Sequence, residues 1–338
     1  MLPSSPCSRR PAHGRSVCHA FIDYKYNSNR MNERRIRLAC GDLSAEVAPD
    51  IGGALAWFRA GDHPLLRPEL TSGPYAGRAL GMACFPMVPF ANRIARGRFR
   101  HAGLEILVAC NVSEPHPLHG HGWQAAWTVR EQGARSARLE FRGGPEWPWP
   151  YVAFEEFVLE ADALTIVLGL CNLGDEPAPV SLGLHPFLRH RESMLLEGRA
   201  VCVWERDSEG IPLAARPLPP DEPFNLPRHV ARTDLDHCFD GWTGRAGIRW
   251  PDDRYALCIE AQGCRCLHVY SPAAEDYVCL EPVTARPDAF NPRPDDLAPL
   301  QVVAPGESTQ LSMCLRVESQ PVNLSQQPHE AAPPRPPA

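Results

Sequence analysis

The stretch Leu164-Thr-Ile-Val-Leu-Gly-Leu170 decides the fold class. Its leucine and isoleucine residues alternate with Thr165, Val167 and Gly169. Successive side chains of a β-strand point to opposite faces, so this period of two predicts a strand with one buried face. The stretch Arg138-Leu-Glu-Phe-Arg142 alternates in the same way and predicts a second strand.

Turn signals separate such runs along the chain. They lie at His101-Ala-Gly103, Glu131-Gln-Gly133, Ala161-Asp162, Gly174-Asp-Glu-Pro177 and Pro305-Gly306. Long helical patterns are missing from the sequence. Many short strands at hairpin spacing predict an all-β sandwich or barrel with little helix, and argue against alternating β-α units.

The two ends of the chain differ in composition from its middle. Residues 1–33 are predicted to be a disordered leader or a mis-assigned start, because residues 1–30 are rich in Ser, Pro and Arg and Met31 directly precedes the first periodic segment. Residues 319–338 form a predicted Pro-rich disordered tail. The folded domain is expected to span residues 34–318.

Charge and hydropathy exclude two classes of partner. The 338 residues include 40 acidic and 34 basic ones, which gives a net charge of −6. This balance lacks the basic footprint of a nucleic-acid-binding protein. The longest apolar candidate, residues 79–91, is too short for a membrane helix and contains Pro86 and Pro89. We expect a soluble protein that binds neither nucleic acid nor membrane.

Lysine and cysteine usage narrows the chemistry further. Lys25, in the leader, is the single lysine of the chain, which argues against Schiff-base and phosphate-loop chemistry in the folded part. The 13 cysteines lack paired C-x-x-C spacing, and we interpret residues such as Cys110, Cys171 and Cys258 as buried in apolar strands. Reduced thiols of this kind predict a cytoplasmic location.

The sequence gives little support for nucleotide binding, serine-hydrolase chemistry or a metal site. Residues 120–125, Gly-His-Gly-Trp-Gln-Ala, match a dinucleotide fingerprint by letters, but neither the preceding strand nor the following helix is present in the pattern. No G-x-S-x-G serine-hydrolase motif occurs. His116, His119 and His121 could ligate a metal, but no nearby carboxylate supports them, and from these residues alone a surface loop is the favoured interpretation.

Two strand faces carry candidate functional groups. One combines Ser181, Gly183 and His185, where glycine would let a ligand approach the sheet; a satisfied interior histidine explains the pattern equally well. The other combines Tyr277, Cys279 and Glu281. A glutamate that ends an apolar strand either works in a cleft or emerges into solvent, and emergence is the commoner case.

Five tracts in order resemble the aldose 1-epimerase (galactose mutarotase) family. They are Phe90-Ala-Asn-Arg-Ile-Ala-Arg-Gly-Arg-Phe99, Leu118-His-Gly-His-Gly-Trp123, Leu184-His-Pro-Phe187, Leu235-Asp-His-Cys-Phe239 and Leu280-Glu-Pro-Val-Thr-Ala-Arg-Pro-Asp-Ala-Phe-Asn291. The similarity runs from about residue 40 to 316. It implies a large antiparallel β-sandwich, no metal or organic cofactor, and an aldohexose such as glucose or galactose as substrate for a monomer or homodimer.

The resemblance also implies roles for individual residues. Glu281 is similar to the family's general base, and His185 to its general acid. The implied sugar contacts are Asn92, Arg93, His119 and Asp236. Opening a cyclic hemiacetal needs a base at the C1 hydroxyl and an acid at the ring oxygen, and we expect an ionised Glu281 and a protonated His185 on opposite sides of the sugar.

Three departures from the family pattern put the preferred sugar in doubt. His121 replaces the second glycine of the commoner Leu-His-Gly-Gly loop, Phe187 replaces a tyrosine, and Pro-Val-Thr follows Glu281 where many members have Thr-Gln. Two alternative functions remain: a hexose-6-phosphate 1-epimerase, which needs a basic phosphate pocket, and a non-catalytic carbohydrate-binding domain, which has no need of both Glu281 and His185. A metal-dependent cupin-like enzyme comes last.

Overall fold

The computed structural model describes residues 34–189, 194–219, 228–229, 235–251, 253–273 and 275–320. Within these residues the chain forms β-strands and three short 3-10 helices, so the predicted all-β class with little helix is confirmed. The helices are η1 (Ala79–Gly81), η2 (Ala95–Gly97) and η3 (Gly122–Gln124). The predicted leader, residues 1–33, and residues 321–338 of the predicted tail lie outside the described residues.

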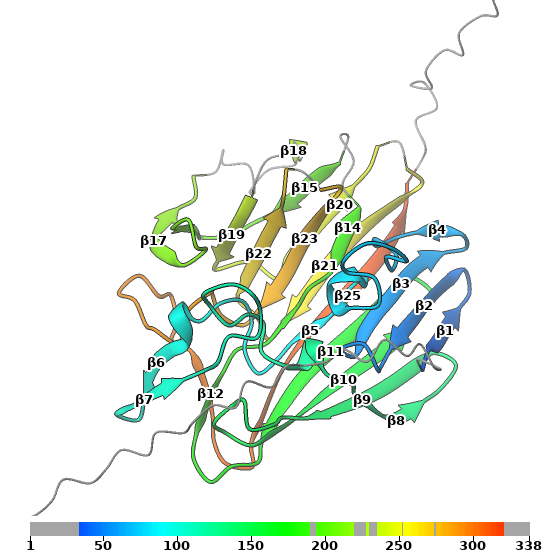
Figure 1. Cartoon of the computed structure of the whole chain (residues 1–338). Coiled ribbons are helices and arrows are strands. Elements are labelled where there is room, and N and C mark those ends of the chain that lie inside the picture. The colour runs from blue at the N-terminus through cyan, green and yellow to red at the C-terminus, as the bar shows by residue number, and fades with distance from the viewer. Residues whose placement is uncertain are drawn as a thin grey trace, which may run out of the picture. The chain divides into compact units, whose positions relative to one another are not determined.

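The larger of two main sheets has nine antiparallel strands (Figure 1). In spatial order they are β18 (Arg228–His229), β15 (Leu195–Gly198), β20 (Arg245–Arg249), β21 (Tyr255–Gln262), β25 (Ser308–Ser319), β11 (Ala163–Asn172), β10 (Tyr151–Leu159), β9 (Ser136–Arg142) and β8 (Thr128–Gln132). Both strands predicted from alternation, β9 and β11, are present in this sheet.

The second main sheet has eight strands and contains Asp236 on β19 and Glu281 on β23. Its order is β17 (Pro212–Pro217), β16 (Cys202–Arg206), β19 (Leu235–Asp240), β22 (Cys266–Ser271), β23 (Tyr277–Val283), β13 (Gly183–Leu184) and β5 (Pro86–Met87), with β14 (Phe187–Arg189) also paired to β23. All pairings are antiparallel, as hairpin connections favour.

Three smaller sheets complete the described fold. The first contains β1 (Ile36–Cys40), β2 (Leu43–Ala48), β3 (Ala54–Ala60) and β4 (His63–Pro64). The others pair β6 (Arg98–His101) with β7 (Leu104–Leu107), and β12 (Ala178–Val180) with β24 (Gln301–Val303).

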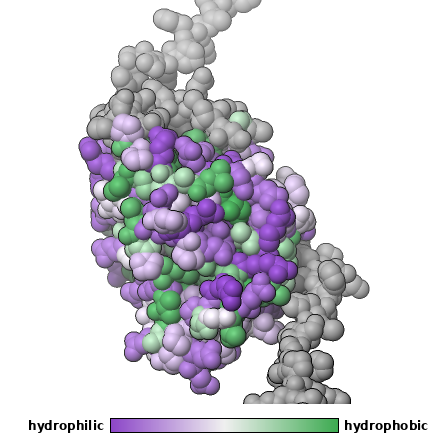
Figure 2. Space-filling model, turned by 90° about the vertical axis from the view of Figure 1, so that its left-hand side faces the viewer, coloured by the Kyte–Doolittle hydropathy of each residue, from purple (hydrophilic) through white to green (hydrophobic). Residues whose placement is uncertain are grey.

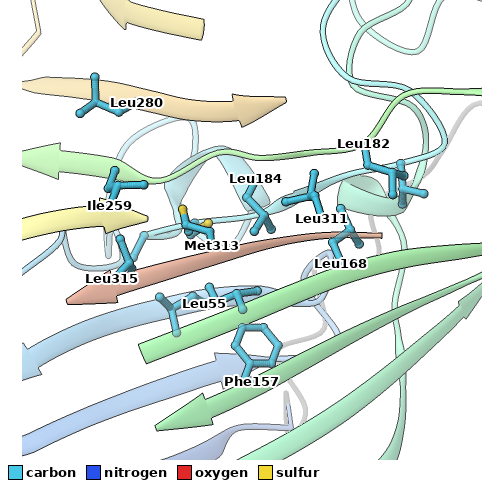
Figure 3. Close-up of a cluster of buried hydrophobic side chains, with 14 of the residues drawn as sticks. Leu55, Phe157, Leu168, Leu182, Leu184, Ile259, Leu280, Leu311, Met313 and Leu315 are labelled. Carbon is cyan, nitrogen blue, oxygen red and sulfur yellow. The ribbon is translucent and has the colours of Figure 1, made fainter. Parts of the chain in front are cut away.

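A main core fills the space between the large sheets. The apolar face of β11 is fully buried and lies beside the apolar face of β25, because Leu168 pairs with Leu311 and Ile166 with Met313. Figure 3 shows side chains of this face in one cluster with residues of the eight-stranded sheet such as Leu184 and Leu280. Burial of these side chains contributes roughly 1.5–3 kcal/mol each to the stability of the sandwich.

The last described residues of the chain are paired in the nine-stranded sheet and tied to a neighbouring turn. Strand β25 continues to Ser319, and the side-chain amide of Gln320 donates hydrogen bonds to the carbonyls of Trp250, Asp253 and Tyr255. These hydrogen bonds attach Gln320 to the turn between β20 and β21.

The cysteines of the described residues are all free thiols. Cys258 is buried on β21 and Cys171 is half-buried on β11, as the strand interpretation requires. The interpretation of Cys110 was wrong: it is exposed and lies outside the strands.

The outer surface is mixed in character. On the face shown in Figure 2, hydrophobic residues are interspersed among hydrophilic ones. In the part of the chain that the structure describes, no helix has the length and apolar character needed to cross a membrane.

Candidate active site

The candidate site lies on the face of the eight-stranded sheet that points away from the main core. Strand β23 alternates, so that Val278 and Leu280 belong to the main core while Cys279 belongs to a second, smaller apolar cluster on the other face. Glu281 shares the face of Cys279 and is 1% exposed. The expectation that a glutamate here emerges into solvent is therefore wrong, because the loops of residues 79–125 cover this face.

His185 and Glu281 meet directly. His185 lies between β13 and β14, both of which pair with β23, and its Nε2 atom is 3.2 Å from Oε1 of Glu281. Two aromatic rings stack on the imidazole, with centroid distances of 4.5 Å for Phe85 and 4.7 Å for Phe187. The phenylalanine that replaces the family's tyrosine thus helps to hold the imidazole in place.

Gly183 does not create room for a ligand, contrary to the expectation. A Cβ atom at this position would lie 2.5 Å from the Met87 side chain and 2.7 Å from that of Val283. The glycine is therefore explained by close packing of β5, β13 and β23.

Burial changes the proton affinities of the pair in opposite directions. It lowers the pKa of His185 to about 3 and raises that of Glu281 to about 7, an effect on Glu281 that the charge of His268 partly offsets. A buried acid and base in contact titrate as a unit. In the absence of a sugar the pair favours one proton on Glu281 and a neutral His185, which is the reverse of the expected distribution with the same number of protons.

Asn92 and His119 hold each other through two hydrogen bonds. The backbone N–H of Asn92 donates to Nδ1 of His119 at 3.1 Å, and the backbone N–H of His119 donates to the carbonyl of Asn92 at 3.0 Å. Because Nδ1 accepts, a neutral His119 carries its proton on Nε2. Burial lowers the pKa of His119 well below its ordinary value, with His185 and Arg93 adding to the effect, so this neutral form is favoured.

Arg93 connects this loop to Asp236 on β19. Its Nη1 donates to Oδ1 of Asn92 at 3.3 Å and lies 3.8 Å from Oδ2 of Asp236. The guanidinium also reaches Glu114. Gly210, in the turn between β16 and β17, lies so close to Arg93 that a Cβ atom there would be 3.0 Å from the guanidinium. The arginine is thus held from several sides.

Asp236 is the centre of a second charged group. Its Oδ1 atom is 2.8 Å from Nε2 of His268, and Arg206 lies 3.7 Å from its Oδ2 atom. Burial would raise the pKa of Asp236, but the hydrogen bond from His268 and the nearby positive charges lower it below its usual range. Asp236 is therefore ionised at neutral pH.

The histidines of the 116–121 stretch do not gather around a metal position. His116 and His119 are buried, which corrects the surface-loop interpretation, and Nδ1 of His116 accepts a hydrogen bond from the backbone N–H of Arg96. His121 packs its ring edge against Phe90. The three imidazoles therefore make separate contacts, with Arg96, Asn92 and Phe90 respectively, and do not converge on one point.

One group of the described residues has ligand atoms close enough for a metal ion. His185, Cys279 and Glu281 place these atoms within 4.8 Å of one another. A zinc-bound cysteine must be a thiolate. Burial raises the pKa of the Cys279 thiol well above its usual value, and Glu281 adds to the effect. Without a metal the thiolate form of Cys279 is disfavoured, and a metal would have to displace the thiol proton to bind here.

All six residues predicted from the resemblance lie in one continuous cluster. Contacts lead from Glu281 to His185, from the His185 ring to that of His119 at 5.4 Å, and onward through Asn92 and Arg93 to Asp236. The residues that the sequence reasoning missed are His268 and Arg206. His268 interrupts the apolar run Cys266-Leu-His-Val-Tyr270, and a polar residue in such a run could have marked it as a candidate site residue.

Comparisons with known proteins show the family and the fold of the chain. The sequence profile of the aldose 1-epimerase family matches residues 34–316. The Escherichia coli K12 protein YphB is 36% identical over 293 residues, which cover 83% of this chain and 98% of YphB. The E. coli K12 protein YihR is 26% identical over 274 residues, covering 76% of this chain and 85% of YihR.

Solved structures have the same fold. One is the crystal structure of an E. coli K12 protein described as a candidate aldose 1-epimerase, with a TM-score of 0.78 and 31% sequence identity. The aligned region covers 85% of this chain and 99% of the E. coli chain. A galactose mutarotase-like protein from Clostridium acetobutylicum has a TM-score of 0.75 at 18% identity, covers 84% of this chain and 95% of its own, and shows likeness of fold. The profile match and the likeness to YphB establish that the chain belongs to the aldose 1-epimerase family.

Proposed function

We propose that the protein is a cofactor-independent aldose 1-epimerase that interconverts the α and β anomers of free aldohexoses. The observation that carries the proposal is the buried contact of 3.2 Å between Nε2 of His185 and Oε1 of Glu281. An acid and a base this close can act on two neighbouring oxygens of one sugar, the C1 hydroxyl and the ring oxygen.

Two proton transfers describe the reaction. Glu281 removes the proton of the C1 hydroxyl while His185 protonates the ring oxygen, and the bond between C1 and the ring oxygen breaks to give an open aldehyde. Rotation about the C1–C2 bond presents the other face of the carbonyl. The two residues then reverse their roles, and each general acid or base step contributes typically ~10²–10⁴-fold to the rate.

The single proton shared by the pair fits this chemistry. A sugar that inserts its C1 hydroxyl at Glu281 and its ring oxygen at His185 replaces the direct contact between the two side chains. For catalysis the proton that Glu281 holds in the free protein has to move to His185. Glu281 is then an ionised carboxylate that can act as the base, and His185 is a protonated imidazolium that can act as the acid. The overall proton count of the pair is unchanged before and after turnover.

Charge compensation around Asp236 favours a free sugar over a phosphorylated one. Arg93 and Arg206 lie 3.8 Å and 3.7 Å from its Oδ2 atom, so one carboxylate already balances part of their charge. A mixed group of guanidinium, carboxylate and imidazole supplies both donors and acceptors, as sugar hydroxyls require. A phosphate site would need the arginine charges without the opposing carboxylate.

Polarimetry tests the proposal. We expect the protein to accelerate the mutarotation of α-D-glucose or α-D-galactose, and Glu281→Gln to lower kcat by at least about 10²-fold while the fold survives. Glu155→Gln is the matched control, because Glu155 is also 1% exposed but lies on β10 of the other sheet. Burial raises its pKa well above the usual range, so glutamine resembles its neutral form.

The other outcomes lead to different functions. No acceleration of either free sugar, but acceleration of glucose 6-phosphate mutarotation, would replace the proposal by a hexose-6-phosphate 1-epimerase. Sugar binding without acceleration would indicate a carbohydrate-binding domain. Glu281→Gln with near-normal turnover would remove Glu281 from the mechanism.

We also propose that the protein works in the cytoplasm. The free thiols of the described residues support this location, because exposed or half-buried thiols such as Cys110 and Cys171 persist most readily in a reducing compartment.

A further inference from the structure

His268 is a buried ionisable group that the proposed mechanism does not use. It lies on β22, directly across from Glu281 on β23, and is 4% exposed. Opposed residues of neighbouring antiparallel strands have Cβ atoms about 4.5–5.5 Å apart. The imidazole of His268 therefore shares the sheet face of the catalytic pair and lies next to its carboxyl group.

Asp236 fixes the orientation of this imidazole. Its Oδ1 atom lies 2.8 Å from Nε2 of His268, which leaves Nδ1 of His268 on the side away from Asp236. Nδ1 is buried without a hydrogen-bond partner, and so is Oε2 of Glu281. The ionised Asp236 at Nε2 and the nearby carboxyl group of Glu281 favour an imidazolium through their charge, while Nδ1 gains no hydrogen bond from the described residues.

The charged or titratable groups around His268 come from every neighbouring element. They are Asp236 and His237 from β19, Glu281 from β23, His185 from the β13–β14 connection, Arg93 and His119 from the covering loops, and Arg206 from β16. Burial alone would lower the pKa of His268, but Glu281 and Asp236 outweigh burial and Arg93 and raise it above its ordinary value.

We propose that His268, held by Asp236, is a positioning residue whose positive charge weakens the hold of the His185–Glu281 pair on its shared proton. The inference rests on the proposed function, because it concerns the proton that the pair delivers to the ring oxygen. That oxygen is a weak base, so a pair that binds its proton less tightly is the stronger acid toward it. The charge of His268 acts at short range in a site of low dielectric, where it is little screened.

The substitution His268→Gln separates charge from hydrogen bonding. Glutamine keeps an N–H donor for Asp236 but carries no charge. We expect the pH at which kcat/KM begins to fall, near pH 7, to rise by about one unit. At the pH where activity is maximal, kcat should fall by about twofold to tenfold, with KM little changed. His101→Gln is the control, because this ring lies on β6 against the carbonyl of Pro177 and should leave both limb and kcat unchanged.

The proposal would be overturned if a folded His268→Gln variant lost kcat/KM at the same pH as the unchanged protein. A merely structural role changes the amount of active protein and not the pH at which the pair titrates. A matching shift in His101→Gln would overturn it as well.

An NMR titration of the histidine imidazoles tests the same charge without turnover, and it serves if His268→Gln does not fold. His237 also lies beside Asp236, so the titration is recorded in a His237→Gln background. We expect an imidazole whose pKa lies above the ordinary histidine value and falls in Asp236→Asn. The absence of any such imidazole overturns the inference. Its presence in a protein that turns over no sugar would reject the proposed function and leave the charge of His268 established.

Discussion

Nε2 of His185 lies 3.2 Å from Oε1 of Glu281, and both side chains are almost fully buried. Glu281 lies on β23 and His185 lies in the connection between β13 and β14, and the two meet because both β13 and β14 pair with β23. A contact of this length joins their titrations, and the pH dependence of the protein should therefore report the pair.

Turnover should fall above about pH 7. Burial lowers the pKa of His185 to about 3 and raises that of Glu281 to about 7, so the pair holds one proton between these values and none above the higher one. Without that proton no acid remains for the ring oxygen. We expect kcat/KM, which reports the free protein, to be flat from about pH 5 to 7 and then to fall by about tenfold per pH unit.

This profile is measured by polarimetry after subtraction of the spontaneous reaction in each buffer. A kcat/KM that continues to rise through pH 8 would contradict the one-proton description of the pair.

Phe85→Leu should lower kcat by about tenfold through the position of His185. The Phe85 ring stacks on the imidazole at 4.5 Å, and a loss of aligned contact lets the acid move away from its productive geometry. Phe157→Leu is the control, because this ring is equally buried on β10 in the main core. Both variants should lose stability in urea titrations, and equal kcat losses in the two would argue against a special role of the stacked ring.

Removal of metal ions should leave activity unchanged. His185, Cys279 and Glu281 lie close enough for a metal, but burial raises the pKa of the Cys279 thiol, so that a metal would have to displace its proton to bind. We expect full activity after dialysis against EDTA and less than one equivalent of zinc in the purified protein. Activity that is lost with EDTA and restored by zinc, but not in Cys279→Ser, would assign a metal to this group.

Leu168→Ala should destabilise the sandwich by about 2–5 kcal/mol, because Leu168 is fully buried opposite Leu311 in the main core and the shortened side chain leaves a cavity. Val158→Ala on the neighbouring strand β10 should cost less than about 1 kcal/mol, since Val158 is 42% exposed. Urea denaturation measures both. A Leu168→Ala protein as stable as the Val158→Ala protein would show that this part of the core collapses around the cavity.

Local patterns were sufficient for the class of fold. The alternation of residues 164–170 and 138–142 appears directly as β11 and β9, because side-chain direction along a strand depends on neighbouring residues alone. The pairing order was not accessible in this way. Nothing in the sequence of β11 indicates that β25, from the far end of the chain, lies beside it.

For the site, the five ordered motifs predicted six candidate residues between Asn92 and Glu281. A resemblance of motifs depends only on residue type and order along the chain, and needs no knowledge of contacts. The burial of Glu281, the direct contact with His185 and the presence of His268 beside them were decided by the tertiary structure alone. The physical reason is that proton affinity depends on the surrounding charges and on exclusion of water, and both are supplied by strands and loops distant in sequence.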